Sequence, residues 1–175
     1  MPGYLFRQMS DEEAREISGW SYEPPYDFYD VASDEDDLAE LLDRKRRKDA
    51  YFSAFDDEGA LVGFFQFEVK EGTVDVGLGL RPDLTGAGMG LDYLLAGLEF
   101  ARERFSPTRF TLAVATFNER AIRVYEHAGF SRGNVYMHRT NGGEFRFLAM
   151  AREAWDPGAA TRRLPRRARR GRPRR

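Results

Sequence analysis

Two short stretches of the sequence contain residues whose types and spacing suit chemistry. The first is a run of alternate glycines, Gly86, Gly88 and Gly90, which follows an alternating apolar stretch and precedes a helical pattern. In a strand, glycine loop and helix, several backbone N–H groups converge without side chains in the way, and the helix dipole adds positive potential. The expected ligand group is a phosphate or pyrophosphate. A glycine-rich turn that binds no ligand is the alternative.

The spacing of these glycines excludes two nucleotide-binding loops. Residues 86–90 (GAGMG) lack the GxGxxG spacing of a dinucleotide site, and no Gly-Lys-Ser or Gly-Lys-Thr follows as in a Walker loop.

The second stretch is residues 118–130, NERAIRVYEHAGF. Asn118 is a good N-cap and Gly129 a good stop signal, so a helix of about three turns is predicted between them. Asn118 and Tyr125 are seven residues apart, so they share one face, roughly 10 Å apart along the axis. Taken alone, the two residues indicate a helix cap and a packed tyrosine whose hydroxyl is satisfied.

Together the two stretches resemble the GNAT superfamily of N-acetyltransferases. The segment RPDLTGAGMG before an amphipathic helix resembles the acetyl-CoA-binding motif Arg/Gln-x-x-Gly-x-Gly/Ala. Gly88 and Gly90 match this motif, and Thr85 stands where the family usually has Arg or Gln. The second stretch resembles the signature N-x-x-A-I-x-x-Y-x-x-x-G-F and matches it at every named position.

The resemblance implies acetyl-CoA as co-substrate and a direct transfer of the acetyl group to a primary amine. Asn118 is then expected to hydrogen-bond the pantetheine or pyrophosphate arm, and Tyr125 to give a proton to the departing CoA thiolate. Backbone N–H groups near Gly79 and Leu80 would polarise the thioester carbonyl. The remaining cofactor-binding residues expected are Leu78, Gly79, Leu80, Thr85, Gly86, Ala87, Gly88, Met89 and Gly90.

A base must take the proton of the attacking amine, because a protonated amine cannot attack. Asp75 is the candidate: it lies on the glycine-bearing face of the strand, near where some GNAT enzymes have a glutamate. An exposed strand carboxylate without a catalytic role is the alternative. The chain has no cysteine, which agrees with direct transfer but leaves serine open as a nucleophile.

The elements that position these residues follow from hydrophobic periodicity. Strands are predicted over residues 4–9, 50–55, 61–69, 74–80, 109–115, 134–140 and 144–151. Helices are predicted over residues 10–18, 34–48, 90–105 and 118–129. The chain crosses from the fourth strand to the fifth through one helix, which favours a parallel pairing. The resemblance implies an α/β fold with a central mixed sheet of about seven strands flanked by helices.

Residues 19–30 (GWSYEPPYDFYD) hold five aromatic side chains around Pro24-Pro25 and cannot form a regular helix. In GNAT proteins the corresponding loop walls the acceptor cleft. Tyr22, Glu23 and Tyr26 are therefore expected at the substrate. The alternative is that these rings only cover the edge of the core.

The net charge of −2 conceals an asymmetry, because residues 156–175 hold nine arginines and one aspartate. One catalytic domain is predicted over residues 1–155, followed by an Arg-rich tail over residues 156–175 that is disordered in isolation. The tail either contacts nucleic acid or another polyanion, or is an extension without a partner.

Length and composition fit a soluble globular protein with neither a transmembrane helix nor a signal peptide, so a cytoplasmic location is expected. His127 and His138 belong to no metal-binding pattern, and no metal is expected. A monomer or a homodimer is expected.

The function predicted from these features is an acetyl-CoA-dependent N-acetyltransferase, with a cationic small molecule as the favoured acceptor because residues 1–155 are acidic. One alternative is a non-catalytic acyl-CoA-binding regulatory module that reaches nucleic acid through its Arg-rich tail. A second is a nucleotide-binding domain unrelated to CoA.

Overall fold

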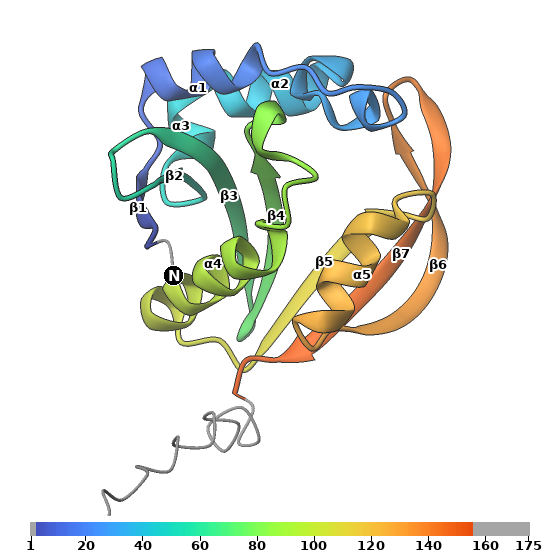
Figure 1. The fold of residues 1–175 in the computed structure, drawn as a ribbon. Coiled ribbons are helices and arrows are strands. Elements are labelled where there is room, and N and C mark those ends of the chain that lie inside the picture. Colours follow the sequence, from blue (N-terminus) through green and yellow to red (C-terminus); the bar gives the residue numbers. More distant parts are fainter. Residues whose placement is uncertain (1–2, 156–175) are drawn as a thin grey trace, which may run out of the picture.

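A seven-stranded mixed sheet with helices on both faces forms the centre of the protein (Figure 1). The computed structural model describes residues 3–155. The strand order is β1-β2-β3-β4-β5-β7-β6, and every neighbouring pair is antiparallel except β4 and β5. The strands are β1 (Leu5–Gln8), β2 (Tyr51–Phe55), β3 (Leu61–Lys70), β4 (Thr73–Leu80), β5 (Arg109–Ala115), β6 (Ser131–Thr140) and β7 (Gly143–Glu153). The predicted fold class is confirmed.

Five α-helices accompany the sheet in the part of the chain that the structure describes. They are α1 (Asp11–Ser18), α2 (Glu35–Leu42), α3 (Arg44–Arg47), α4 (Gly90–Phe105) and α5 (Glu119–His127). Short 3₁₀ turns lie at Tyr26–Tyr29, Val31–Ser33 and Pro82–Leu84. The helix predicted over residues 34–48 is in fact two helices, because the Asp43 carboxylate accepts hydrogen bonds from the N–H groups of Lys45 and Arg46 and so begins a new helix.

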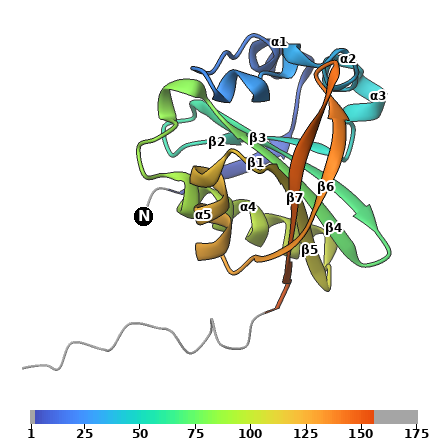
Figure 2. The same ribbon diagram turned by 90° about the vertical axis from the view of Figure 1, so that its right-hand side faces the viewer.

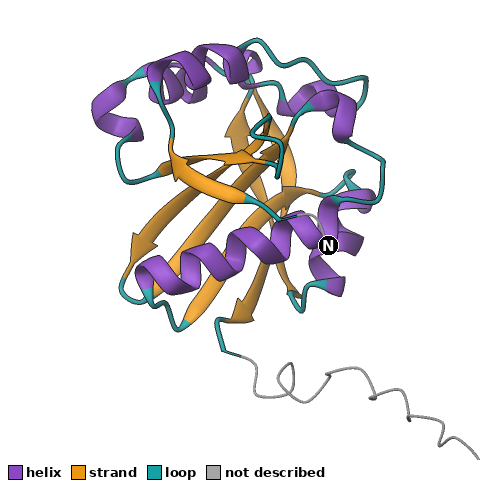
Figure 3. Cartoon of the chain, turned by 60° about the vertical axis from the view of Figure 1, so that its left-hand side comes forward, coloured by secondary structure: helices purple, strands orange, loops and turns teal. Residues whose placement is uncertain are grey.

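The two faces of the sheet are covered by different helices. Figure 3 shows α4 lying across one face. On that face, α4 and α5 bury one large apolar cluster, whose strand residues include Phe65, Val74, Val76, Phe110, Leu112 and Met150. Gly97 of α4 lies against the ring of Phe65, and a Cβ there would meet the ring at 2.1 Å, so only glycine allows this approach.

The opposite face is covered only in part. A second apolar cluster joins α1 and α2 to β2 and β3 through Ala14, Ile17, Leu41, Tyr51 and Leu61. A large hollow beside β5, β7 and β6 is lined by small strand residues such as Ala113, Ala149 and Ala151, and also by residues of α4 and α5. Strand β6 is the edge of the sheet, and nearly all of its residues are exposed.

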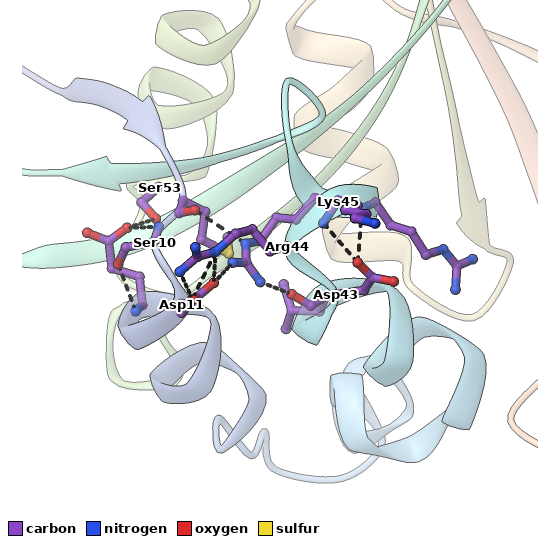
Figure 4. Close-up of polar contacts among 11 residues, drawn as sticks. Ser10, Asp11, Asp43, Arg44, Lys45 and Ser53 are labelled. Atoms are coloured by element: carbon purple, nitrogen blue, oxygen red, sulfur yellow. Dashed lines mark hydrogen bonds and ion pairs between the residues drawn. The ribbon is translucent and has the colours of Figure 1, made fainter.

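A polar network fixes α1 and α3 to the first strands (Figure 4). Ser10 and Glu13 form a capping box at the start of α1. The buried Glu13 carboxylate also accepts a hydrogen bond from the Ser53 hydroxyl at 2.8 Å and pairs with Arg7 at 2.7 Å. The Arg47 side chain is buried, pairs with Asp11, and donates to the carbonyls of Met9 and Leu41. The network therefore holds the helices that line one side of the cavity described below.

Strands β4 and β5 are paired over only three residues. Their partners are Thr73 with Arg109, Val74 with Phe110 and Asp75 with Thr111. Beyond Asp75 the two strands separate, while β4 stays paired to β3 as far as Leu80. Figure 1 shows β4 and β5 close together at their lower ends and apart at their upper ends. The sheet therefore has a gap at its centre. Figure 2 shows α5 next to α4.

Within residues 3–155 no helix is long and apolar enough to span a membrane. The Arg-rich tail predicted over residues 156–175 lies outside the described residues.

Candidate active site

A cavity of about 350 Å³ lies along the end of β4, at Gly77 to Leu80, where β4 is no longer paired to β5. Its lining comes from both faces of the sheet. One end is formed by Thr85, Asn118, Arg120 and Tyr125, beside the glycine loop and α5. The other end lies under α1, α2 and the turn between β6 and β7, and its lining includes Trp20, Asp37, Leu41, Phe64, Gln66, His138 and Asn141. The two ends of the cavity are thus lined by different elements.

The end of β4 offers unpaired backbone groups to this cavity. Successive residues of a strand turn their N–H groups to opposite sides. The N–H of Arg81 donates to the carbonyl of Val62, next to β3, at 2.8 Å. The N–H groups of Leu78 and Leu80 therefore point away from β3, into the gap. Donors fixed in this way suit an oxyanion or an extended amide chain.

Tyr125 brings a free hydroxyl to the cavity. It is partly buried on α5, its ring lies 6.3 Å from that of Phe130, and within residues 3–155 its hydroxyl has no hydrogen-bond partner. Burial raises the pKa of Tyr125 well above its ordinary value, and the neighbouring phenol of Tyr29 adds to the rise. Tyr125 is therefore protonated at every physiological pH and can act only as a proton donor or a hydrogen-bond partner.

Asn118 caps α5 and lines the same cavity. Its side-chain oxygen accepts a hydrogen bond from the N–H of Ala121 at 3.2 Å, as an N-cap does. It also contacts the phenol of Tyr29, which accepts a hydrogen bond from the N–H of Ala115 at 3.1 Å. The cap read from the sequence is confirmed, and part of the hydrogen-bonding capacity of Asn118 is already used inside the protein.

The glycine loop leads into the N-terminus of α4. Gly86 and Gly88 have φ of +75° and +80°, and a Cβ built at Gly88 meets no atom within 4 Å. The N-cap residue Met89 makes no side-chain hydrogen bond to the helix. The first N–H groups of α4 therefore have no side-chain acceptor from their cap, and the space in front of Gly88 is open. Such a helix start can bind an anion.

The two tyrosines expected at the substrate line the cavity. The hydroxyl of Tyr22 donates to the carbonyl of Leu80 at 2.6 Å, which attaches the aromatic segment to the end of β4. The ring of Tyr26 lies beneath Arg120, with 4.0 Å between the guanidinium carbon and the ring centroid. Glu23 is exposed and does not line the cavity.

The structure does not bring Asp75 into this cavity. Asp75 lies where β4 and β5 are still paired, and its carboxylate accepts a hydrogen bond from the Thr111 hydroxyl at 2.6 Å. It lines the large hollow beside β5, β7 and β6 instead. The expected alternation along β4 is present, but Asp75 lies five positions before Leu80 along the strand.

Several residues of the far end of the cavity were not predicted from the sequence. Asp37, the neighbour of His138 across the cavity, has a pKa raised by burial and by the nearby carboxylates of Asp34 and Glu40, while His138 lowers it. Gln66 donates to Glu40 at 2.9 Å, which leaves its carbonyl oxygen available. No local motif marks these residues, because they come from α2, β3 and β6. Residues 3–155 contain no group of three or more His, Cys, Asp or Glu that could hold a metal ion.

The chain belongs to the GNAT acetyltransferase family. The family model described as "Acetyltransferase (GNAT) domain" matches residues 2–131, which include the glycine loop and α5. The cavity at the separated strands and the two motifs beside it are thus features of a member of that family.

Curated relatives match part of the chain. A mycothiol acetyltransferase of Salinispora arenicola is 33% identical over 107 residues, which cover 54% of this chain and 35% of the relative. A mycothiol acetyltransferase of Propionibacterium freudenreichii is 40% identical over 84 residues, or 45% of this chain and 26% of the relative. The matches span about a third or less of the length of these relatives.

Solved structures share the fold along most of the chain. The spermidine N-acetyltransferase of Vibrio cholerae, in complex with CoA and spermine, has a TM-score of 0.69 at 18% identity, covering 86% of this chain and 95% of that one. A GNAT acetyltransferase of Bacillus anthracis has a TM-score of 0.68 at 16% identity, covering 86% and 95%. At these identities the likeness concerns the fold.

Proposed function

We propose that the protein is an acetyl-CoA-dependent N-acetyltransferase that transfers an acetyl group directly to a primary amine. The observation that carries this proposal is the cavity along the end of β4, where β4 is no longer paired to β5. It joins an anion-binding helix start on one side to an aromatic and acidic pocket on the other. Family membership supports the same chemistry.

Acetyl-CoA is assigned to the end of the cavity beside α4 and α5. The N–H groups of the glycine loop and of the start of α4 fit the pyrophosphate, and Gly88 leaves room for it. The pantetheine arm then lies along β4, where the N–H groups of Leu78 and Leu80 replace the strand pairing that β5 no longer provides. This places the thioester carbonyl near the end of β4.

The transfer needs one bond to form and one to break. The lone pair of the neutral amine attacks the thioester carbon, and the N–H groups at the end of β4 stabilise the oxyanion. The C–S bond then breaks, and Tyr125 gives its proton to the departing sulfur. The attacking nitrogen loses one proton as it becomes the amide, and this proton balances the one that Tyr125 gives to the sulfur. Tyr125 is then protonated again, so the number of protons is unchanged.

The amine must reach the thioester in its neutral form. His138 and Asp37 line the acceptor end, and an imidazole is the usual general base, which can take a proton directly or through water. Asp75 does not belong to this proposal because it lies outside the cavity. The acceptor end is also lined by aromatic and apolar side chains, among them Trp20, Leu41 and Phe64.

An amine with a second positive charge is the acceptor class that this lining fits. The Asp37 carboxylate and the Gln66 carbonyl oxygen are hydrogen-bond acceptors, and the rings of Trp20 and Phe64 can pack on an aliphatic or cationic chain. The Vibrio cholerae structure in complex with CoA and spermine is named a spermidine N-acetyltransferase, and spermidine is an amine of this kind.

Incubation of the full chain with labelled acetyl-CoA and a panel of amines tests the proposal. The panel should hold monoamines, diamines, polyamines, amino sugars and peptides with free N-termini. We expect labelled amide with the di- and polyamines, and a melting temperature raised by acetyl-CoA and CoA but not by NAD. Binding of NAD without CoA, or CoA binding with no labelled product from any amine, would contradict it.

A further inference from the structure

Arg120 lies at the glycine loop although it belongs to another helix. It is the second residue of α5, and one of its terminal nitrogens is 3.6 Å from the point where a Cβ of Gly86 would be. Its guanidinium carbon lies 4.0 Å from the centroid of the Tyr26 ring. The side chain thus reaches from α5 to the loop before α4 and lies on an aromatic ring that fixes its direction.

The charge of Arg120 is not neutralised inside the protein. Among the residues that the structure describes, no carboxylate pairs with the Arg120 guanidinium, which makes a cation–π contact with the ring of Tyr26. Other arginines of this region are paired: Arg123 with Glu119, and Arg132 with Glu126. A cation in the first turn of a helix is also opposed by the helix dipole. An unpaired guanidinium in this place is explained if an anion binds there.

The glycine loop lacks a long polar side chain of its own. Thr85 stands where the family motif usually has Arg or Gln, and its hydroxyl is turned back to donate to the carbonyl of Pro82 at 2.7 Å. The cap residue Met89 gives no polar group either. In the glycine loop and at the start of α4, only backbone N–H groups can therefore bind a phosphate.

We propose that Arg120 binds the pyrophosphate of acetyl-CoA in place of the side chain missing at Thr85, and that Tyr26 is the positioning residue that holds Arg120 over the loop. The proposal rests on the proposed function for the identity of the ligand. A guanidinium can give two parallel hydrogen bonds to phosphate oxygens, and it keeps its charge at every physiological pH. Tyr26, expected at the acceptor from the sequence, thereby acts on the cofactor.

Affinity measurements with two cofactor forms test the role of Arg120. CoA and 3′-dephospho-CoA both contain the pyrophosphate, and only CoA contains the 3′-phosphate. We expect Arg120→Ala in the full chain to weaken the binding of both CoA and 3′-dephospho-CoA about tenfold. Arg123→Ala is the matched control, because it removes the same charge from the next turn of α5, where Glu119 is the partner, and should change neither affinity by more than about twofold.

Each result of this experiment has one reading. If Arg120→Ala weakens CoA but not dephospho-CoA, Arg120 contacts the 3′-phosphate and the proposal is overturned. If the wild type binds both forms and Arg120→Ala binds them equally well, the proposal also fails while the proposed function stands. If the wild type binds neither form, the proposed function itself fails. Melting temperatures without ligand show whether each variant is folded.

A double-mutant cycle tests the positioning role of Tyr26. Made alone, Tyr26→Leu should weaken the binding of both cofactor forms about threefold. When Arg120 is already replaced by alanine, Tyr26→Leu should have no further effect on binding. Tyr26→Phe keeps the ring and should restore the wild-type affinity. A Tyr26→Leu effect that is equally large without Arg120 would assign Tyr26 a merely structural role.

Discussion

The two ends of the cavity are built in different ways. The cofactor end is made of two continuous segments, the glycine loop with the start of α4 and the first two turns of α5, and it presents mainly backbone groups. The acceptor end is made of side chains from α1, α2, β3, β6 and β7. An end built from backbone is set by local sequence, whereas an end built from side chains depends on how distant elements pack.

Long-range hydrogen bonds hold the acceptor end together. Asp34, the N-cap of α2, accepts hydrogen bonds from the hydroxyl of Thr140 at 3.0 Å and from the N–H of Asn141 at 2.9 Å. These hydrogen bonds lower the pKa of Asp34. The side-chain amide of Asn141 donates to the carbonyl of Phe28 at 2.8 Å. The turn between β6 and β7 is thus attached to segments more than 100 residues earlier.

The largest effect is expected at Tyr125, in the cofactor end of the cavity. Tyr125→Phe removes the proton donor but keeps the ring, so acetyl-CoA affinity should not change. We expect kcat to fall by a factor of about 10² if chemistry limits turnover. Tyr136→Phe, outside the cavity on β6, is the control. A single-turnover rate within about threefold of the wild type would show that water or CoA itself supplies the proton.

The next largest effect is expected at the polar network around Glu13, which holds α1 at the acceptor end. Glu13→Ala leaves the N–H of Ser10 and the hydroxyl of Ser53 without their partner, which should lower the free energy of unfolding by about 2 kcal/mol. Glu12→Ala, on the exposed side of the same helix, should change it by less than about 0.5 kcal/mol. Urea unfolding measures the free energy of unfolding of both variants. Equal changes in the two variants would show that the network around Glu13 has no special role in stability.

The same substitution predicts a pH dependence. Burial raises the pKa of Glu13, but hydrogen bonds from Ser10 and Ser53 and the charge of Arg7 lower it by more, so the folded-state pKa is below the unfolded one. The stabilisation is therefore complete above the unfolded pKa, about 4.3, and is lost as the pH falls through the folded pKa. The stability difference between wild type and Glu13→Ala should shrink below about pH 4. A constant difference down to pH 2 would contradict this.

The cofactor end is tested by a single glycine. Gly88→Val places a Cβ in the open space before the loop, where the phosphates are assigned, and should weaken acetyl-CoA about tenfold in a titration. Gly59→Val is the matched control: Gly59 also has a positive φ, of +82°, and no atom within 4 Å, but it lies in the turn between β2 and β3. If both variants bind acetyl-CoA like the wild type, the loop is not the cofactor site.

The smallest effect is expected at the acceptor end. Asp37→Asn should raise KM about threefold for an amine with a second positive charge and leave KM for a monoamine unchanged, because only the distal charge meets this carboxylate. Asp36→Asn, on the same helix and outside the cavity lining, is the control. An equal rise for both kinds of amine would show that Asp37 acts on the reacting nitrogen instead.

Much of the fold was predictable because its signals are local. The alternation over residues 74–80, the stripe of leucines on α4 and the caps at Ser10 and Asn118 each depend on neighbours a few residues away. The predicted order of strands and helices is confirmed, apart from the break at Asp43. The parallel pairing of β4 and β5 was expected from the single crossover, and it is present but short.

The sequence by itself therefore determined the family, the strand and helix order, the glycine loop and the positions of Asn118 and Tyr125 on one helix. The tertiary structure decided where β4 and β5 separate, so that Asp75 lies outside the cavity and Leu78 and Leu80 lie inside it. It also decided that Asp37 lies close enough to His138 for the two to interact electrostatically, and that Arg120 lies on Tyr26. The physical reason is that backbone geometry and capping depend on adjacent residues, whereas contacts between side chains of separate elements form only when the elements pack.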